Sequence, residues 1–125
     1  ISAINRLFAS DQFEDILAAL ESDGSDWAQK ELAALRSKSP QTCKVSLRQL
    51  AEGAKAATFA ENMVIEYRIA SRVIVRPDFA EGVRAVIVDK DNAPQWNPAT
   101  PEAVATDLID TIFAPLPEQE EWKPL

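Results

Sequence analysis

The chain has 125 residues, of which 46% are hydrophobic and 26% charged, a composition that fits one globular domain and is too apolar for a disordered segment. Its 13 Lys and Arg against 20 Asp and Glu give a net charge of −7, which repels phosphate groups at long range. The longest apolar runs are far too short to span a bilayer. We therefore expect neither nucleic acid nor a membrane as a partner.

The first half of the chain predicts four short helices. Residues 1–8 place apolar side chains on one face, and Asp23-Gly24 ends the second helix. The second to fourth helices begin at predicted caps, which are Asp11 with Glu14, then Ser25, then Ser39 followed by Pro40. The fourth helix carries an apolar stripe formed by Cys43, Leu47, Leu50 and Ala54.

The second half predicts three more helices, so the expected fold class is all-α, with short helices joined by tight turns. Their predicted starts are Thr58 with Glu61, Asp78 with Glu81, and Thr100 with Pro101. The fifth helix is expected to turn these side chains inward: Met63, Tyr67, Ala70 and Ile74. Residues 86–88 are β-branched, so a short buried strand is an alternative to a helix end there. Residues 115–125 are predicted to form a loose tail.

Several kinds of chemistry are excluded by residue type. The chain has no histidine, which rules out Ser-His-Asp or Cys-His hydrolysis and most zinc sites within it. Its three glycines are isolated, so there is no phosphate-binding glycine loop. Asp89, Asp91 and Asn92 suggest a calcium loop, but Pro94 stands where that loop needs glycine. We therefore expect no catalytic residue, no metal site and no cofactor in these residues.

The single cysteine, Cys43, cannot form an internal disulfide and lies on the apolar stripe of the predicted fourth helix. A free cysteine in such a position usually packs as a small apolar side chain. A reducing compartment is consistent with this composition, and the expected location is cytoplasmic.

Four segments in order, with matching intervals, resemble one family. They are Ser39–Leu50 (SPQTCKVSLRQL), Glu66–Arg68 (EYR), Asp78–Ala85 (DFAEGVRA) and Asp89–Asp91 (DKD), followed by Pro94 and Trp96. Together they resemble the carboxy-terminal part of 3-hydroxyisobutyryl-CoA hydrolases, a branch of the crotonase (enoyl-CoA hydratase/isomerase) superfamily. The similarity runs from the first residues to about Pro98.

The resemblance implies that residues 1–114 are the carboxy-terminal helical region of a crotonase-like enzyme without its ββα core. The parent enzyme would hydrolyse 3-hydroxyisobutyryl-CoA in valine catabolism, with acyl-CoA as its substrate. Members of the family carry the oxyanion hole and the catalytic carboxylates in an amino-terminal core, so this chain alone would be inactive. Its helices would pack over that core, its missing partner, and contribute to a homo-oligomer.

Two alternatives remain open at this stage. The parent could be an enoyl-CoA hydratase or isomerase, or the chain could act purely as a helical assembly module. Because the chain begins at Ile1, already with helical spacing, we interpret it as a segment cut from a longer protein.

The family also implies candidate site residues between positions 81 and 96. In related hydratases this segment places a basic residue and an aromatic one near the CoA nucleotide. Lys90 falls close to the basic position as a possible CoA phosphate contact, between Asp89 and Asp91, while Val86 occupies the aromatic position. Arg84 could contact the missing core or substrate, or be an ordinary half-exposed arginine. The large ring of Trp96 is expected to anchor its loop by packing.

Overall fold

A computed structural model of the chain describes residues 1–124. Over this range its regular elements are all helices, with no strand, which confirms the expected fold class. The α-helices are α1 (Ser2–Leu7), α2 (Phe13–Asp23), α3 (Asp26–Arg36), α4 (Pro40–Gly53), α5 (Phe59–Val73), α6 (Pro77–Val83) and α7 (Thr106–Phe113). A π-helical turn, η1 (Arg84–Val88), continues α6, and a 3₁₀ turn, η2 (Pro101–Ala103), precedes α7.

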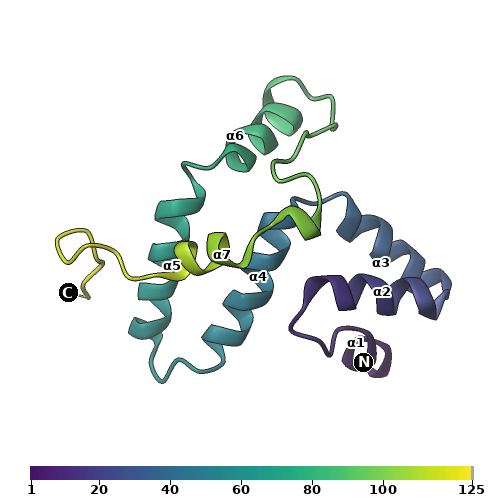
Figure 1. The fold of residues 1–125 in the computed structure, drawn as a ribbon, viewed down its shortest axis with the longest axis horizontal. Helices are drawn as coiled ribbons and strands as arrows, with labels where there is room; N and C mark the ends of the chain where they lie inside the picture. The colour runs from purple at the N-terminus through teal and green to yellow at the C-terminus, as the bar shows by residue number, and fades with distance from the viewer. Residues whose placement is uncertain (125) are drawn as a thin grey trace.

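The helices enclose two small apolar cores instead of one. The first joins α1, α2 and α3 through Leu7, Ile16, Leu20, Ala28 and Leu32. The second joins α4, α5, α7 and the residue after η2 through Val45, Ile69, Val104, Ile109 and Ile112. Figure 1 shows the α2–α3 pair at one end, α5 running back beside α4, and α7 against both. Helix α4 contributes to both cores, since Leu47 packs against the first one.

Helix α6 and η1 form an arm that belongs to neither core. The arm lies at the edge of the molecule, beyond one end of α4 and α5 (Figure 1). The predicted strand alternative for residues 86–88 is wrong, because this segment is π-helical. The N–H of Asp89 donates to the carbonyl of Arg84 at 2.8 Å, and the N–H of Asn92 donates to the carbonyl of Ala85 at 3.0 Å. These backbone hydrogen bonds lie within the segment itself, so it pairs with no neighbouring strand.

Three of the predicted helix caps are confirmed. The side-chain oxygens of Ser25, Ser39 and Thr58 accept hydrogen bonds from N–H groups three residues later, at 3.2, 3.1 and 3.1 Å. Pro40 occupies the first turn of α4, where its missing N–H leaves no donor unpaired. Gly24 ends α2 with φ of 67°, a left-handed conformation that glycine adopts without steric cost.

Three predicted helix starts are wrong. Helix α2 is preceded by Gln12 as its N-cap, and Asp11 makes no cap. Asp78 lies inside the first turn of α6, so it does not cap that helix. Thr100 caps only the three-residue turn η2, and α7 begins later, at Thr106. For Asp78 and for η2 the cause is contact with distant parts of the chain, which local spacing does not reveal.

The inward face predicted for α5 is also wrong. Tyr67 and Ile74 are 42% and 57% exposed, whereas Ile69 is buried at 8% exposed. Ile65 and Val73 pack beside Ile69 against the second core. The cause is α7, which covers the side of α5 that carries these three residues.

The segment from 115 to 124 is held against α5, contrary to the prediction of a loose tail. Nε and Nη2 of Arg68 donate to the Glu121 carboxylate, the shortest of these bonds being 2.8 Å. Arg72 donates to the carbonyls of Ile112 at 3.2 Å and Pro115 at 3.0 Å, which satisfies backbone acceptors at the end of α7. The division of the chain at residue 114 stays a prediction.

Candidate functional site

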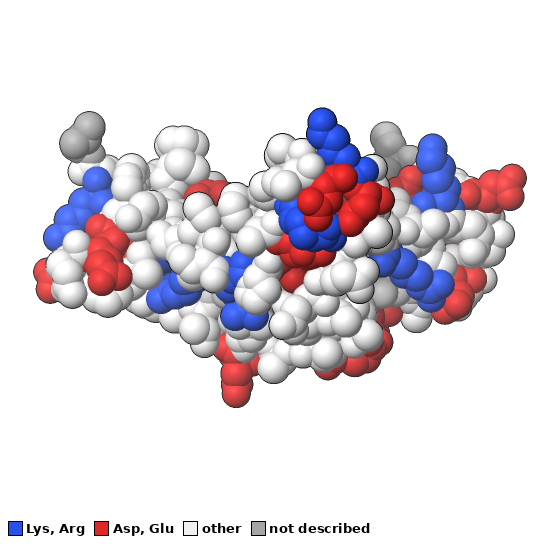
Figure 2. Space-filling model, turned by 90° about the horizontal axis from the view of Figure 1, so that it is seen from above, with Lys and Arg blue, Asp and Glu red and all other residues white. Residues whose placement is uncertain are grey.

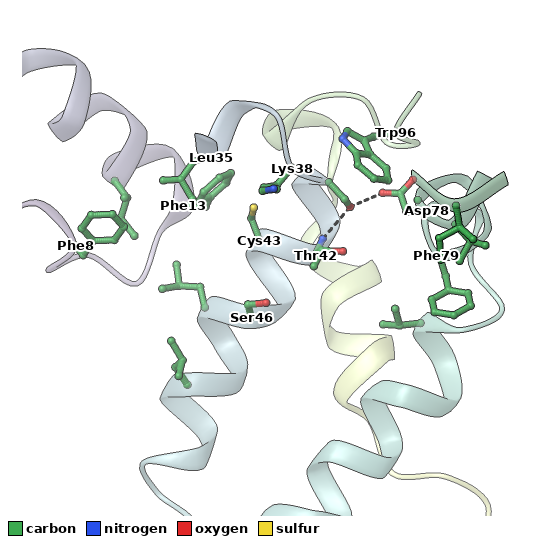
Figure 3. Close-up of a pocket in the computed structure, with 18 residues that line it drawn as sticks. Phe8, Phe13, Leu35, Lys38, Thr42, Cys43, Ser46, Asp78, Phe79 and Trp96 are labelled. Atoms are coloured by element: carbon green, nitrogen blue, oxygen red, sulfur yellow. Dashed lines mark hydrogen bonds between the residues drawn. The ribbon is translucent and has the colours of Figure 1, made fainter. Parts of the chain in front are cut away.

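An apolar groove of about 780 Å³ runs along α4. One wall comes from the first core, the floor from α4, and the other wall from the α6–η1 arm (Figure 3). We call it the α4 groove, and its principal lining residues are Phe13, Leu35, Cys43, Leu47, Leu50, Phe79, Val83 and Ile87.

The floor of the groove is the apolar stripe that the sequence predicts for the fourth helix. Cys43, Leu47 and Leu50 do share one face, but this face lines the open groove and is not sealed in a core. Leu50 is 73% exposed. In Figure 3, Cys43 and Ser46 lie between the aromatic rings of Phe8 and Phe13 on one side and the arm on the other.

The arm extends this apolar surface beyond the groove. Between positions 74 and 88, seven large apolar side chains are classed as exposed, and five of them are at least 57% exposed. Those five are Ile74, Val75, Val86, Ile87 and Val88. Exposed apolar side chains in this number, at the end of α5 and on the arm, are typical of a surface where another protein packs.

The Cys43 thiol in the groove is not activated as a nucleophile. Burial raises the pKa of the Cys43 thiol, so the reactive thiolate is disfavoured there. Within the described residues, no group of three or more histidine, cysteine, aspartate or glutamate side chains could hold a metal ion. In the same part of the chain, no helix combines the length and the apolar character needed to cross a bilayer.

A buried carboxylate, Asp78, ties the arm to the start of α4. Asp78 is 5% exposed and accepts a hydrogen bond from the Ser39 hydroxyl at 2.5 Å and from the Asn97 N–H at 2.7 Å. Beside it, the Trp96 indole N–H donates to the carbonyl of Ser37 at 3.1 Å, and its ring lies 3.6 Å from where a Cβ on Gly82 would be. These contacts support the prediction that Trp96 is a packing anchor for its loop.

Arg84 gathers three carboxylates at the far end of the arm. It donates to both oxygens of Glu81 at 2.9 and 2.8 Å, to Asp89 at 2.7 Å and to Asp91 at 2.6 Å. Hydrogen bonds from Arg84 and from the N–H of Gln95 lower the pKa of Glu81 to about 2. The same guanidinium lowers the pKa of Asp91, and the three carboxylates raise that of Arg84.

Lys90 lies in this loop, outside the α4 groove. It is exposed and adopts a left-handed backbone with φ of 57°. Among residues 1–124, no carboxylate lies within 4.0 Å of its ammonium group, although aspartates flank it in the sequence. Sequence reasoning missed the role of Arg84 in this arrangement, and the signal available was its spacing of three residues from Glu81.

Comparison with known proteins assigns the family. Residues 1–113 match the sequence profile of the family described as "Enoyl-CoA hydratase/isomerase". The chain belongs to this family. It is 42% identical over 113 residues to the mitochondrial 3-hydroxyisobutyryl-CoA hydrolase of Gallus gallus and 39% identical over 118 residues to that of Danio rerio. These alignments cover 90% and 94% of the chain but 29% and 31% of the two relatives.

Two solved structures share the fold of the chain. One is an enoyl-CoA hydratase from Rhodobacter sphaeroides, with a TM-score of 0.87 and 36% identity over 96% of the chain and 35% of that structure. The other is a carnitinyl-CoA dehydratase from Mycobacterium thermoresistibile, with a TM-score of 0.87 and 29% identity over 94% of the chain and 33% of that structure. The chain therefore corresponds to the carboxy-terminal part of crotonase-like proteins and spans about a third of their length.

Proposed function

We propose that this chain is the helical region of an acyl-CoA thioester hydrolase acting on 3-hydroxyisobutyryl-CoA in valine catabolism, and that it has no catalytic activity alone. The observation that carries this proposal is the open α4 groove, which continues onto the exposed apolar arm. Burying each of these large apolar side chains against another surface contributes about 1.5–3 kcal/mol to the free energy of association. A larger catalytic body packed against the groove provides that cover, and the names of the curated relatives support the substrate.

In this proposal the chain closes and shapes the active site, and the catalytic residues belong to the larger catalytic domain that packs against the groove. Thioester hydrolysis needs donors that polarise the carbonyl and a carboxylate that activates water. Within the described residues, the carboxylates with lowered pKa are bound by cations or hydroxyl groups, such as Glu81 by Arg84 and Glu121 by Arg68. A base with a depressed pKa is a poor proton acceptor at neutral pH.

A chimeric enzyme tests this proposal. In it, the chain replaces the matching 113-residue segment of the Gallus gallus hydrolase. We expect the chimera to release CoA from 3-hydroxyisobutyryl-CoA and the purified chain alone to release none. Leu50→Glu with Ile87→Glu should prevent assembly of the chimera, whereas Lys30→Glu on the exposed side of α3 should not. Turnover by the isolated chain, or a soluble chimera without activity, would contradict the proposal.

A hydratase or isomerase is the second candidate for the parent, because the two solved structures named above are an enoyl-CoA hydratase and a carnitinyl-CoA dehydratase. The two candidates differ in the bond that is broken. A hydrolase releases free CoA from 3-hydroxyisobutyryl-CoA, whereas a hydratase adds water to an enoyl-CoA and keeps the thioester intact. Assaying the whole enzyme with both substrates separates the two.

Self-association is a further part of the proposal, since the exposed apolar arm can pack against a second copy of the chain. The isolated chain is then an oligomer at high concentration, and Val75→Asp with Val86→Asp shifts it toward monomer. Sedimentation velocity measures this, and a monomer at all concentrations would contradict it. The chain acting purely as a helical assembly module predicts the same oligomer but an inactive chimera.

Lys90 is proposed as a contact for a CoA phosphate, on the support of its exposed position and its lack of a carboxylate within 4.0 Å among residues 1–124.

The cytoplasmic location stays a prediction from the composition, and the curated relatives are named as mitochondrial proteins. Microscopy of the tagged protein distinguishes the two compartments.

A further inference from the structure

One guanidinium, that of Arg84, binds three carboxylates around the loop that contains Lys90. Nη1 of Arg84 donates to both Asp89 and Asp91, while Nε and Nη2 donate to the two carboxylate oxygens of Glu81. Figure 2 shows one compact group in which acidic and basic side chains lie against each other, with further charged side chains spaced along the same face. The Arg84 side chain is 32% exposed, which places it between Glu81 at 19% and the more exposed Asp91 and Asp89.

The carboxylates that Arg84 holds also fix the loop that contains Lys90. Asp91 accepts a hydrogen bond from the N–H of Ala93 at 2.9 Å, and Glu81 accepts one from the N–H of Gln95 at 2.8 Å. Because Arg84 binds Asp89 before Lys90 and Asp91 after it, the left-handed turn at Lys90 lies between two anchored residues.

The sequence alone places Lys90 between two aspartates that would weaken its attraction for an anion. In the structure, both aspartates lie on Arg84 instead. We infer that Arg84 is a positioning residue for an anion-binding site at Lys90, because it holds Asp89 and Asp91 away from the ammonium group and fixes the loop. This inference rests on the proposed role of Lys90 and names phosphate monoesters as the class of ligand.

Removing the Arg84 guanidinium would change the balance of charges around Lys90. Three carboxylates, those of Glu81, Asp89 and Asp91, lose their shared cation, and the two aspartates that flank Lys90 are released from Arg84. A phosphate would then compete with these carboxylates for one ammonium group. Arg84→Lys restores the charge but not the forked geometry that reaches three partners, so its effect should be smaller.

The test measures binding of adenosine 3′,5′-bisphosphate, which carries the phosphates of the CoA nucleotide, to the 125-residue chain at low salt. Isothermal titration gives the affinity, and amide chemical shifts report residues 89–95. We expect Lys90→Gln to abolish binding and Arg84→Gln to weaken it about five- to tenfold, with the difference shrinking at high salt. Lys55→Gln, an exposed lysine beyond α4, serves as the control and should bind normally.

A rescue experiment separates this role from a merely structural one. Adding Asp89→Asn and Asp91→Asn to Arg84→Gln removes the competing carboxylates, so binding should return to within about twofold of the unmodified chain. Unchanged binding by Arg84→Gln, or a loss that the two further substitutions do not restore, would overturn the inference and leave the hydrolase proposal standing. Absence of binding by the unmodified chain would overturn both the inference and the Lys90 contact, and the chimera assay would still decide the hydrolase proposal.

Discussion

Replacing Asp78 by alanine should lower the free energy of unfolding by about 3–6 kcal/mol, because two hydrogen bonds to a buried charge, at about 1.5–3 kcal/mol each, are lost. The donors are the Ser39 hydroxyl at 2.5 Å and the Asn97 N–H at 2.7 Å, and Asp78 is only 5% exposed. Ser39→Ala removes one of these bonds and a helix cap worth about 1 kcal/mol, for a loss of about 3 kcal/mol.

The two substitutions share one hydrogen bond, so their effects should not add. In a double-mutant cycle, the coupling energy between Ser39 and Asp78 should be about 1.5–3 kcal/mol. Urea denaturation followed by circular dichroism at 222 nm measures each free energy, and a loss of 1 kcal/mol corresponds to a melting temperature lower by about 4 °C for a chain of this size.

Asp11→Ala is the matched control for this cycle. Asp11 is exposed and makes no helix cap, so its loss should cost under about 0.5 kcal/mol. Additive effects of the Ser39 and Asp78 substitutions, with a coupling energy below about 0.5 kcal/mol, would refute the view that this pair joins the arm to α4.

Three further outcomes follow from other contacts. Leu20→Ala, at a fully buried position, should cost about 2–5 kcal/mol in the same urea assay, and a loss below about 1 kcal/mol would contradict its burial. The pKa of Glu81 is depressed from 4.5 to about 2, so its contribution to the stability of the folded loop is complete above pH 4.5 and is lost as the pH falls toward 2. Faster amide hydrogen exchange across the loop at low pH would detect this loss. Glu121→Gln frees the terminal segment from Arg68, and protease cleavage after residue 114 should become several-fold faster; an unchanged rate would show that the ion pair does not hold it.

Features set by neighbouring residues could be predicted from the sequence. The caps at Ser25, Ser39 and Thr58 depend on an N–H three residues away, and all three form as expected. The predicted caps at Asp11 and Asp78 satisfy the same spacing but do not form. For Asp78 the reason is visible, since a hydroxyl 39 residues away and a loop N–H 19 residues away take its oxygens.

The candidate site was predicted only in part, because periodicity shows that a face is apolar but not what covers it. The stripe of Cys43, Leu47 and Leu50 is present, yet it lines a groove. On α5 the contact with α7 selects Ile69 over Tyr67 as the buried residue, which depends on a helix 40 residues further along the chain. Lys90 could be singled out by family resemblance, but its separation from Asp89 and Asp91 depends on the Arg84 side chain.

The division of the buried side chains into two small cores affects how inherited changes in this region would act in a cell. Each core holds five buried apolar residues, so the folded state has little stability to spare. A substitution that loosens the packing over the groove raises the population of unfolded molecules, and cellular quality control degrades these. Such a variant would show itself as a shortage of the protein, with the surviving copies folded in the ordinary way.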